Sequence, residues 1–434
     1  MNGRWKRVAV GSAVAAAIAI GGGAAAYATG VIGGGSSGMI VGCAKKDTGD
    51  LRIVGDASQC RRGERVVAFQ APIPPPAPQY LTVDCGAGQS VDKALAGADP
   101  TEPVTITIKG RCTEAVTIAR GDVTLNGNAP GDGITAPAGA NSALSLNGAQ
   151  RAVLNQLTLT GGAWTLLASS GSSFYGSELH VSGGSDTGVA IDLGASGQLH
   201  DPAVDGSHQG VHVSAGGSLS IDGGTVSNSA TFGISSDGGH TRLGGGLVIS
   251  NSGWNGLFAV HGGSIEASDT TVETSGQSAV FAYNGGAIHL FGDGVLVDHN
   301  SGQGVSALGS AAVQIQDGVR ITNNGQAGVT ASGDAALQIQ GATITGNTGQ
   351  GVVLSLASTA EIDGTTITGN SSDGVYVGDT SVVQFNYGGN GNNTITGNGG
   401  WGVTCQGAPA VAMMHGRPGT VSGNTYGPVN CPSV

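Results

Sequence analysis

The sequence predicts an all-β solenoid in which short parallel strands stack coil upon coil, and three observations support that fold class. A similar phrase recurs about every 23 residues from residue 188 onwards, which is typical of repeat architectures. Two apolar positions, two residues apart, recur within each phrase. The composition combines 81 glycines with only 11% charged residues, without the strict triplet period of collagen.

Each repeat opens on a small residue, almost always Gly, which a β-branched or apolar residue follows directly. The phrase closes on Val or Ile, Ser or Thr, often Gly, and then Asn, as in Ile367-Thr-Gly-Asn370. The opening residues are Gly188, Gly210, Gly233, Gly256, Ala279, Gly304, Gly328, Gly351, Gly374 and Gly402.

The apolar positions lie one and three residues after each opening residue, as at Val189 with Ile191 and at Val352 with Leu354. Alternate side chains of a strand share one face, so these columns predict the inward face of stacked parallel strands. Such buried surface is what disordered chains lack. The low Leu content argues against a leucine-rich or helical solenoid. We expect 12 or 13 coils, which at about 4.8 Å each form a rod on the order of 60 Å long.

The first 28 residues read as a secretory signal peptide. Arg4, Lys6 and Arg7 form a basic start, an apolar stretch of small residues follows, and Ala26-Tyr27-Ala28 fits a cleavage site. A membrane anchor is the alternative, but so many Gly and Ala residues make a poor spanning helix. A lipoprotein box at 40–43 is a further alternative, although polar residues 33–38 separate it from the apolar stretch. We expect a secreted or extracytoplasmic protein, in the periplasm or at the cell surface, with no stable membrane span after cleavage.

The rest of the chain divides into three parts. Residues 29–70 form a small cysteine-bounded β-module, which resembles modules near the start of many bacterial surface and fibre-like proteins. Residues 71–80 are a stiff Pro-rich linker. Residues 81–434 form the solenoid, and it begins with a short helix over 89–98 that Ser90 caps. A solenoid needs such a cap because its first coil would otherwise expose apolar side chains.

The start of the solenoid carries a recognisable string, from Val83-Asp-Cys85 through Lys109-Gly-Arg-Cys112 to Val123-Thr-Leu-Asn-Gly127. Together with the later Ile-Thr-Gly-Asn phrases, it resembles bacterial right-handed parallel β-helix proteins of the pectate-lyase-like superfold. The resemblance covers roughly residues 81–427. It implies an exported right-handed parallel β-helix, and a fold of this kind does not by itself define an activity.

The six cysteines fall into three local pairs, and an even count in an exported chain implies disulfides rather than metal ligands. Proximity pairs Cys43 with Cys60, Cys85 with Cys112, and Cys405 with Cys431.

Asparagine recurs near the end of many repeats. We expect these residues to stack at a turn, where their amides can form a ladder and where Asn tolerates left-handed backbone. They are Asn228, Asn251, Asn300, Asn323, Asn347, Asn370, Asn398 and Asn424.

Most histidines and many aromatic residues lie between 180 and 299, whereas 303–372 contain neither. Positions two and four after each opening residue alternate with the apolar columns and therefore point outward. This predicts an outward strip across several coils, with acid/base candidates and sugar-stacking platforms. The candidate catalytic residues are Asp192, His212 and Asp237. The candidate substrate-binding residues are Phe258, Phe281, Tyr283, His261 and Arg242, the last two lying in the turn that follows the strip.

Charge limits the partners. Residues 121–434 contain no Lys and four Arg against twenty Asp and Glu, so this body repels nucleic acid, and polyuronates unless a cation such as calcium bridges them. Asp192 or Asp237 could hold that calcium. Neither the catalytic carboxylate and His motifs of polygalacturonases nor the basic groove of pectate lyases occurs in the sequence. We therefore expect an exported protein that binds a polysaccharide or cell-surface glycan without catalysis. A glycoside hydrolase or polysaccharide lyase that uses the outward carboxylates is the alternative. The oligomeric state leaves no signature.

Overall fold

The computed structural model describes residues 39–70, 77–385, 393–406 and 413–431. The predicted signal peptide, residues 29–38 and residues 71–76 of the predicted linker lie outside the described residues. Two compact units divide between Pro76 and Ala77. Within the described ranges, no helix has the length and apolar character needed to cross a membrane.

The first unit is a three-stranded antiparallel sheet in the order β2–β1–β3. Its elements are β1 (Met39–Lys45), β2 (Leu51–Val54), the 3-10 turn η1 (Ala57–Gln59) and β3 (Glu64–Gln70). A module of this size buries little apolar surface and depends on cross-links. The Cys43–Cys60 disulfide is one of them. The other joins Arg52 to Glu64, whose Nη2 and Oε2 atoms lie 2.9 Å apart, and this contact lowers the pKa of Glu64 to about 2.

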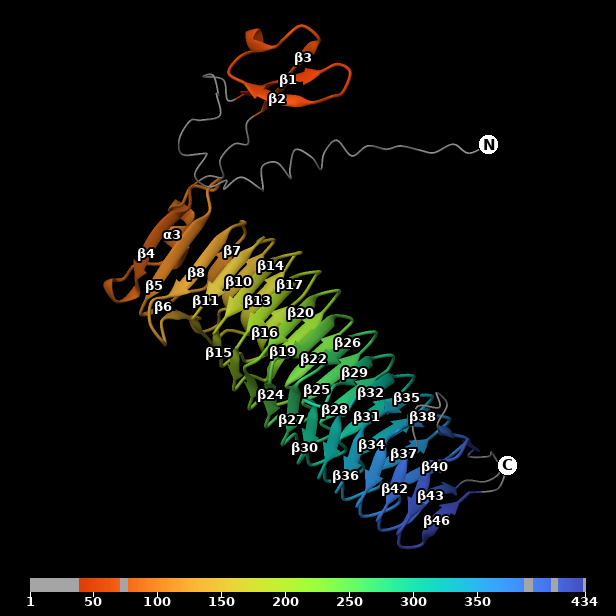
Figure 1. Ribbon diagram of the computed structural model, residues 1–434. Coiled ribbons are helices and arrows are strands. Elements are labelled where there is room, and N and C mark those ends of the chain that lie inside the picture. The colour runs from red at the N-terminus through yellow and green to blue at the C-terminus, as the bar shows by residue number, and fades with distance from the viewer. Residues whose placement is uncertain (1–38, 71–76, 386–392, 407–412, 432–434) are drawn as a thin grey trace. The chain divides into compact units, whose positions relative to one another are not determined.

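The second unit is a parallel β-helix, as the sequence predicts (Figure 1). Each coil contributes one strand to each of three parallel sheets, which contain 14, 15 and 14 described strands. The helix therefore has about 15 turns, more than the 12 or 13 expected. The difference arises because the coils before residue 188 lack the Gly-opening phrase on which that expectation rests.

The first strand of each complete coil belongs to the β7–β46 sheet. Its strands are β7 (Val116–Ile118), β10 (Ser142–Asn147), β13 (Trp164–Ser169), β16 (Thr187–Ile191), β19 (Gln209–Ser214), β22 (Ile234–Asp237), β25 (Leu257–Val260), β28 (Val280–Tyr283), β31 (Val305–Leu308), β34 (Val329–Ser332), β37 (Val352–Ser355), β40 (Val375–Gly378), β43 (Trp401–Gln406) and β46 (Gly427–Asn430).

The second strand belongs to the β4–β44 sheet. Its strands are β4 (Gln79–Asp84), β5 (Val104–Lys109), β8 (Val123–Gly127), β11 (Ala152–Asn155), β14 (Ser173–Ser177), β17 (Ser196–His200), β20 (Ser218–Asp222), β23 (His240–Gly244), β26 (Ser264–Ala267), β29 (Ala287–Phe291), β32 (Ala312–Gln316), β35 (Ala336–Gln340), β38 (Thr359–Asp363), β41 (Val382–Phe385) and β44 (Met413–His415).

The third strand belongs to the β6–β45 sheet. Its strands are β6 (Arg111–Thr113), β9 (Gly133–Thr135), β12 (Thr158–Thr160), β15 (His180–Ser182), β18 (Ala203–Asp205), β21 (Thr225–Ser227), β24 (Leu247–Ser250), β27 (Thr270–Glu273), β30 (Leu296–Asp298), β33 (Arg320–Thr322), β36 (Thr343–Thr345), β39 (Thr366–Thr368), β42 (Thr394–Thr396) and β45 (Thr420–Ser422).

A short helix, α3 (Val91–Gly97), follows the 3-10 turn η2 (Cys85–Ala87) and caps the first coil, as expected. The hydroxyl of Ser90 accepts from the backbone N–H of Lys93. The carboxylate of Glu114, from the next coil, accepts from the Ser90 hydroxyl at 2.7 Å and from a backbone N–H of the helix start at 2.8 Å. Helix N-termini favour such carboxylates, because their first N–H groups lack partners within the helix.

The core is the stack of inward side chains. The residue after each opening position, from Val189 to Val403, is fully buried. The side chains at the third residue after each opening position, from Ile191 to Val377, are also fully buried. At the last of these coils, the side chain in this column, Cys405, is partly buried. The two inward columns predicted from the sequence are therefore confirmed.

The opening glycines are needed for space. At Gly351 an added Cβ would lie 2.3 Å from Cγ2 of Ile367 and 3.0 Å from Nδ2 of Asn370. The backbone passes close to the side chains of the same coil at this position. A residue other than Gly therefore fits there only where the coil has shifted to make room for its Cβ.

The recurring asparagines form two groups, whereas the sequence predicted one. Asn228, Asn251 and Asn323 adopt left-handed backbone, with φ of 54°, 53° and 53°. The others are buried and form a ladder in which each Nδ2 up to that of Asn398 donates to the Oδ1 of the Asn one coil further on, at 2.9–3.0 Å. The ladder consists of Asn300, Asn324, Asn347, Asn370, Asn398 and Asn424. Its second member is therefore Asn324 and not Asn323.

All three predicted disulfides are present. Cys43 pairs with Cys60, Cys85 with Cys112, and Cys405 with Cys431. The second ties the capped first coil to the next one, and the third joins β43 to the residue that follows β46.

Candidate functional site

The predicted strip lies on the outer face of the β7–β46 sheet, from β16 to β28. The strand pairing places Asp192, Ser214 and Asp237 on consecutive coils, and it aligns His212 with Ser235 and Phe258 in a neighbouring column. His212, Phe258 and Phe281 are half-buried, and Tyr283 is 40% exposed. The sheet therefore brings together seven of the eight candidate site residues, once the turn residue His261 is included.

The two candidate carboxylates lie two strands apart, a separation of about 10 Å at the usual strand spacing. Ser214, on the strand between them, donates to Oδ1 of Asp192 at 3.1 Å. Asp237 contacts the next coil, where Nδ1 of His261 lies 3.0 Å from its Oδ1. Each carboxylate thus has its own polar partner, and neither contacts the other through a described hydrogen bond.

His212 is held by hydrogen bonds on its own face of the sheet. Its Nδ1 lies 2.7 Å from the hydroxyl of Ser235, and that hydroxyl donates to Oε1 of Gln209 at 3.0 Å. The same hydroxyl lies 3.3 Å from the carbonyl of Val211. When it donates to Gln209 or Val211, the imidazole donates from Nδ1 and Nε2 is the basic nitrogen. Burial lowers the pKa of His212, and the charges of Asp237, Asp186 and Asp192 oppose that effect without outweighing it. The ring is therefore neutral near pH 7.

The aromatic side chains form one contiguous cluster, which we call the aromatic column. The rings of Phe232 and Phe258 stack with centroids 4.6 Å apart and an interplanar angle of 11°. Phe258 and Phe281 follow at 5.6 Å, and Phe281 and Tyr283 at 5.9 Å. Trp254, which is 47% exposed, packs edge-on against Phe232 at 5.4 Å. The column spans three consecutive coils and presents exposed ring surface at both ends.

Arg242 does not join the strip. The sequence places it in the turn after the strip, but it lies within β23 of the β4–β44 sheet, where Nη2 contacts Oε2 of Glu266 at 2.9 Å. The prediction was wrong about its position because the turn between the two sheets is short, so residues just after it already belong to the next strand.

The predicted calcium site gains no support from the geometry. Calcium takes six to eight oxygen ligands, whereas within the described ranges no third carboxylate or imidazole converges with those near Asp192 or Asp237. A compact group of potential ligands is formed by Cys43, Cys60 and Glu64, but both sulfur atoms belong to the disulfide.

Residues 278–428 match the family model described as "Right handed beta helix region". The fold is a right-handed parallel β-helix. This β-helix is similar to the mannuronan C-5 epimerase AlgE6 A-module from Azotobacter vinelandii, with 17% identity, 78% of this chain and 93% of that chain covered, and a TM-score of 0.41. It is also similar to the periplasmic alginate epimerase AlgG, with 12% identity, 85% of each chain covered and a TM-score of 0.40.

A third similar structure is the Dettilon tailspike protein gp208, with 14% identity and a TM-score of 0.42. The match covers 76% of this chain and 62% of the tailspike chain, so the β-helix spans less than two thirds of that protein. At these identities the likeness extends to the fold alone. No curated protein matches the sequence.

The sequence reasoning missed several members of the strip. Phe232 lies one residue before the opening Gly233, where the other repeats carry a polar or small residue except for Trp401, so an aromatic at that position is a usable signal. Gln209 occupies the equivalent position one coil earlier, and only its hydrogen bond identifies it. Ser235 belongs to the predicted outward column beside His212, and its hydrogen bonds add it to the candidate site.

Proposed function

We propose that this β-helix protein is exported and binds a polysaccharide or cell-surface glycan through the aromatic column and the polar groups beside it. The aromatic column is the observation that carries the proposal. Flat apolar ring faces flanked by carboxylates and imidazoles suit sugars, which present apolar ring faces and many hydroxyls. Three disulfides support an oxidising compartment outside the cytoplasm.

The polar partners of the column match this role. Asp192, Asp237 and His261 lie at or just after the ends of neighbouring strands of the same sheet. The Asp237 and His261 side chains are 45% and 59% exposed. Groups this exposed can exchange water for sugar hydroxyls without leaving a buried charge unpaired. The net acidity of the body favours neutral glycans at this face.

Retention of the full chain on a panel of immobilised neutral and acidic polysaccharides tests the proposal. The double variant Phe258→Ala/Phe281→Ala should lose retention on the bound polysaccharide by about tenfold or more, because central aromatic contacts carry much of such binding energy. Tyr376→Ala is the matched control, since Tyr376 occupies the same outward column on β40, beyond the aromatic column. Equal binding by the double variant and the wild type, or equal loss in Tyr376→Ala, would reject the proposed surface.

A polysaccharide hydrolase or lyase is the second candidate, and the state of His212 favours it. A neutral imidazole with a free Nε2, beside two carboxylates, has the equipment for proton transfer. The same polysaccharide panel can be followed for release of reducing ends and unsaturated uronides. If products form, Asp192→Asn and Asp237→Asn should each lower the rate at least a hundredfold, within the range for general acid–base groups. An unchanged rate in both variants would eliminate this acid/base assignment.

A further inference from the structure

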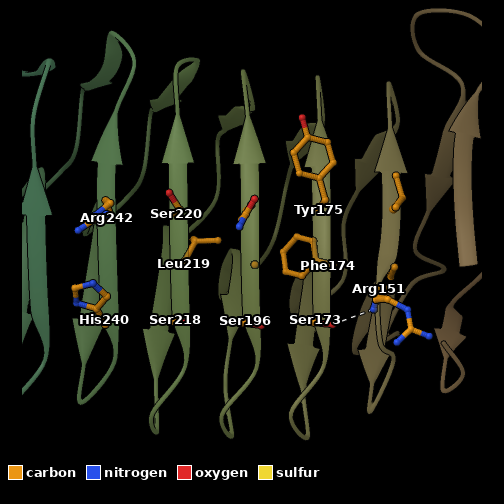
Figure 2. Close-up of a pocket in the computed structure, with 14 residues that line it drawn as sticks. Arg151, Ser173, Phe174, Tyr175, Ser196, Ser218, Leu219, Ser220, His240 and Arg242 are labelled. Atoms are coloured by element: carbon orange, nitrogen blue, oxygen red, sulfur yellow. Dashed lines mark hydrogen bonds between the residues drawn. The ribbon is translucent and has the colours of Figure 1, made fainter. Parts of the chain in front are cut away.

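An open groove with a volume of about 740 Å³ crosses five neighbouring strands of the β4–β44 sheet, from β11 to β23 (Figure 2). Its middle strands, β17 and β20, present small outward side chains at Ser196, Ser218 and Ser220, and Gln198 of β17 is the longer side chain among them. The strands toward its ends carry large ones, with Tyr175 on β14 and Arg242 on β23. The hollow therefore results from side-chain size on an otherwise regular sheet.

The core beneath the groove is adapted to the same shape. Gly197 faces inward, and a Cβ at that position would lie 2.4 Å from Cε1 of Phe174. The Phe174 ring fills the space that a side chain at 197 would take, and it is only 5% exposed. The floor thus rests on a packed ring, while Tyr175, the next residue, points outward and is 40% exposed.

The charged side chains that line the groove are basic, in contrast to those of the body around it. Residues 121–434 contain four Arg against twenty Asp and Glu. Two of the four, Arg151 and Arg242, line this one groove at its opposite ends, and its lining includes no Asp or Glu. His240 lies at the same end as Arg242 (Figure 2). The lining is thus a local exception in an acidic protein, and each guanidinium group pairs with a carboxylate just outside the groove.

Both guanidinium groups are held in place from outside the groove. Nε of Arg151 donates to Asp122 at 2.7 Å, and Nη2 of Arg242 donates to Glu266 at 2.9 Å. In each case Nε and Nη2 serve the protein carboxylate, so the remaining N–H donors of the planar fork stay available. The hydrogen bond from Arg242 lowers the pKa of Glu266, which keeps that pair charged.

We propose that this groove binds an acidic oligosaccharide segment, with carboxylate-bearing sugars at its two ends. Arg151 and Arg242 bind the acid groups, Tyr175 provides a ring face, and the serine hydroxyls on the floor bind sugar hydroxyls. The four strand intervals from β11 to β23 span about 19 Å, long enough for a short oligosaccharide laid across the strands. The site goes beyond the proposed function, because it lies on a different sheet from the aromatic column and selects the opposite ligand charge. It gives Arg242 a substrate-binding role on a surface that the sequence did not predict.

Calorimetric titration of the full chain with tetragalacturonate, and with maltotetraose as the neutral counterpart, tests the site. In the Phe258→Ala/Phe281→Ala variant, which lacks the aromatic column, tetragalacturonate should bind and maltotetraose should bind at least about tenfold more weakly, because charge-assisted hydrogen bonds form only with the former. Arg242→Gln should weaken tetragalacturonate binding about tenfold or more. Ser218→Trp should abolish it, since the larger side chain fills the floor. Glu266→Gln should strengthen it, because it frees Arg242 from its partner.

Two matched controls separate the groove from general charge. Arg320→Gln removes an exposed arginine of the same body on the β6–β45 sheet. Glu361→Gln removes a carboxylate of the same outward column as Glu266, four strands further on, beyond the Debye length of about 8 Å at physiological salt. Both should leave the affinity within twofold of the wild type. Phe258→Ala/Phe281→Ala should also leave tetragalacturonate binding unchanged, so this test can fail or succeed independently of the proposed function.

Three results would overturn the assignment. The first is a wild type that does not bind tetragalacturonate, or a Phe258→Ala/Phe281→Ala variant that binds maltotetraose equally well. The second is unchanged affinity in both Arg242→Gln and Ser218→Trp. The third is an Arg320→Gln loss as large as that of Arg242→Gln, which would make the effect one of net charge.

Discussion

Asp237 and His261 lie on consecutive coils, and Oδ1 of Asp237 is 3.0 Å from Nδ1 of His261. His261 makes this contact from a left-handed backbone conformation, with φ of 50°. A residue other than Gly in that conformation costs roughly 1 kcal/mol or more. The β-helix therefore holds an imidazole at a strained position beside an exposed carboxylate.

We expect His261→Gly to change the free energy of unfolding by less than about 1 kcal/mol. The lost contact joins two exposed side chains and contributes at most about 1 kcal/mol, and Gly relieves the backbone strain by a similar amount. Chemical denaturation measures this, with Asp237→Asn as the matched variant that removes the pair and keeps the backbone. A large destabilisation by His261→Gly alone would show that the imidazole supports the fold and was not placed for binding.

Asn347→Ala should destabilise the protein by about 3 kcal/mol. The side-chain oxygen of Asn347 accepts from both the backbone N–H and Nδ2 of Asn324, and its own Nδ2 donates to Asn370 and to the carbonyl of Ile321. Removing it leaves buried donors and acceptors without partners, at about 1–3 kcal/mol each. Asn323→Gly is the control, since this exposed left-handed residue should tolerate Gly within about 1 kcal/mol. Similar losses in both variants would contradict the separation of the asparagines into two groups.

Gly351→Ala should cost at least about 2 kcal/mol, because its Cβ would overlap a core side chain and the Asn ladder. Gly97→Ala provides the comparison. Its Cβ meets no atom within 4 Å, and Ala is the better helix former at the end of α3, so the change should be neutral or stabilising by up to about 1 kcal/mol. Denaturant midpoints of the two variants against the wild type give the answer, and a harmless Gly351→Ala would mean that the coil can widen.

Protonation of His212 should make stability fall in mild acid. Burial lowers the pKa of His212 from its ordinary value near 6.5. Between the folded pKa and that value, the unfolded chain binds a proton that the folded protein does not, so stability rises with pH across this interval and is lost as pH falls through it. His212→Gln should flatten this part of the stability profile. His180→Gln, which removes an exposed histidine, should not reproduce the effect. An identical pH slope in the wild type and His212→Gln would refute the prediction.

The fold could be predicted because residues close together in the sequence carry the signals that define it. The pair Val189 and Ile191, repeated at every coil, fixes which face of the strand is buried, and the close cysteine pairs fix the disulfides. The capping helix followed from Ser90 and its apolar spacing. Coil number was less certain because the early coils replace the opening Gly by other residues and pack around larger side chains such as Phe174.

The site was only partly predictable because its contacts run between coils. The alternation of outward positions placed Asp192, His212 and Asp237 on one face, and the structure agrees. The same rule does not say where one sheet ends, so Arg242 was assigned to the wrong surface. The alternation rule also does not apply to Tyr175 and Arg151, because both residues precede the regular repeat. Their meeting in one groove depends on the pairing of strands whose sequences share no obvious phrase.

The Asn ladder also bears on how such a chain can change length. Each amide from Asn324 to Asn398 contacts another Asn of the ladder on the coil before it and on the coil after it. A coil duplicated within this stretch would therefore form the same Asn contacts with the coils on both sides. A coil deleted from it would leave two coils that can form these contacts with each other. The decorated coils toward the other end, each with its own side chains, have no such freedom. Evolution can lengthen or shorten one end of this protein by copying a module, while the surfaces at the other end change only residue by residue.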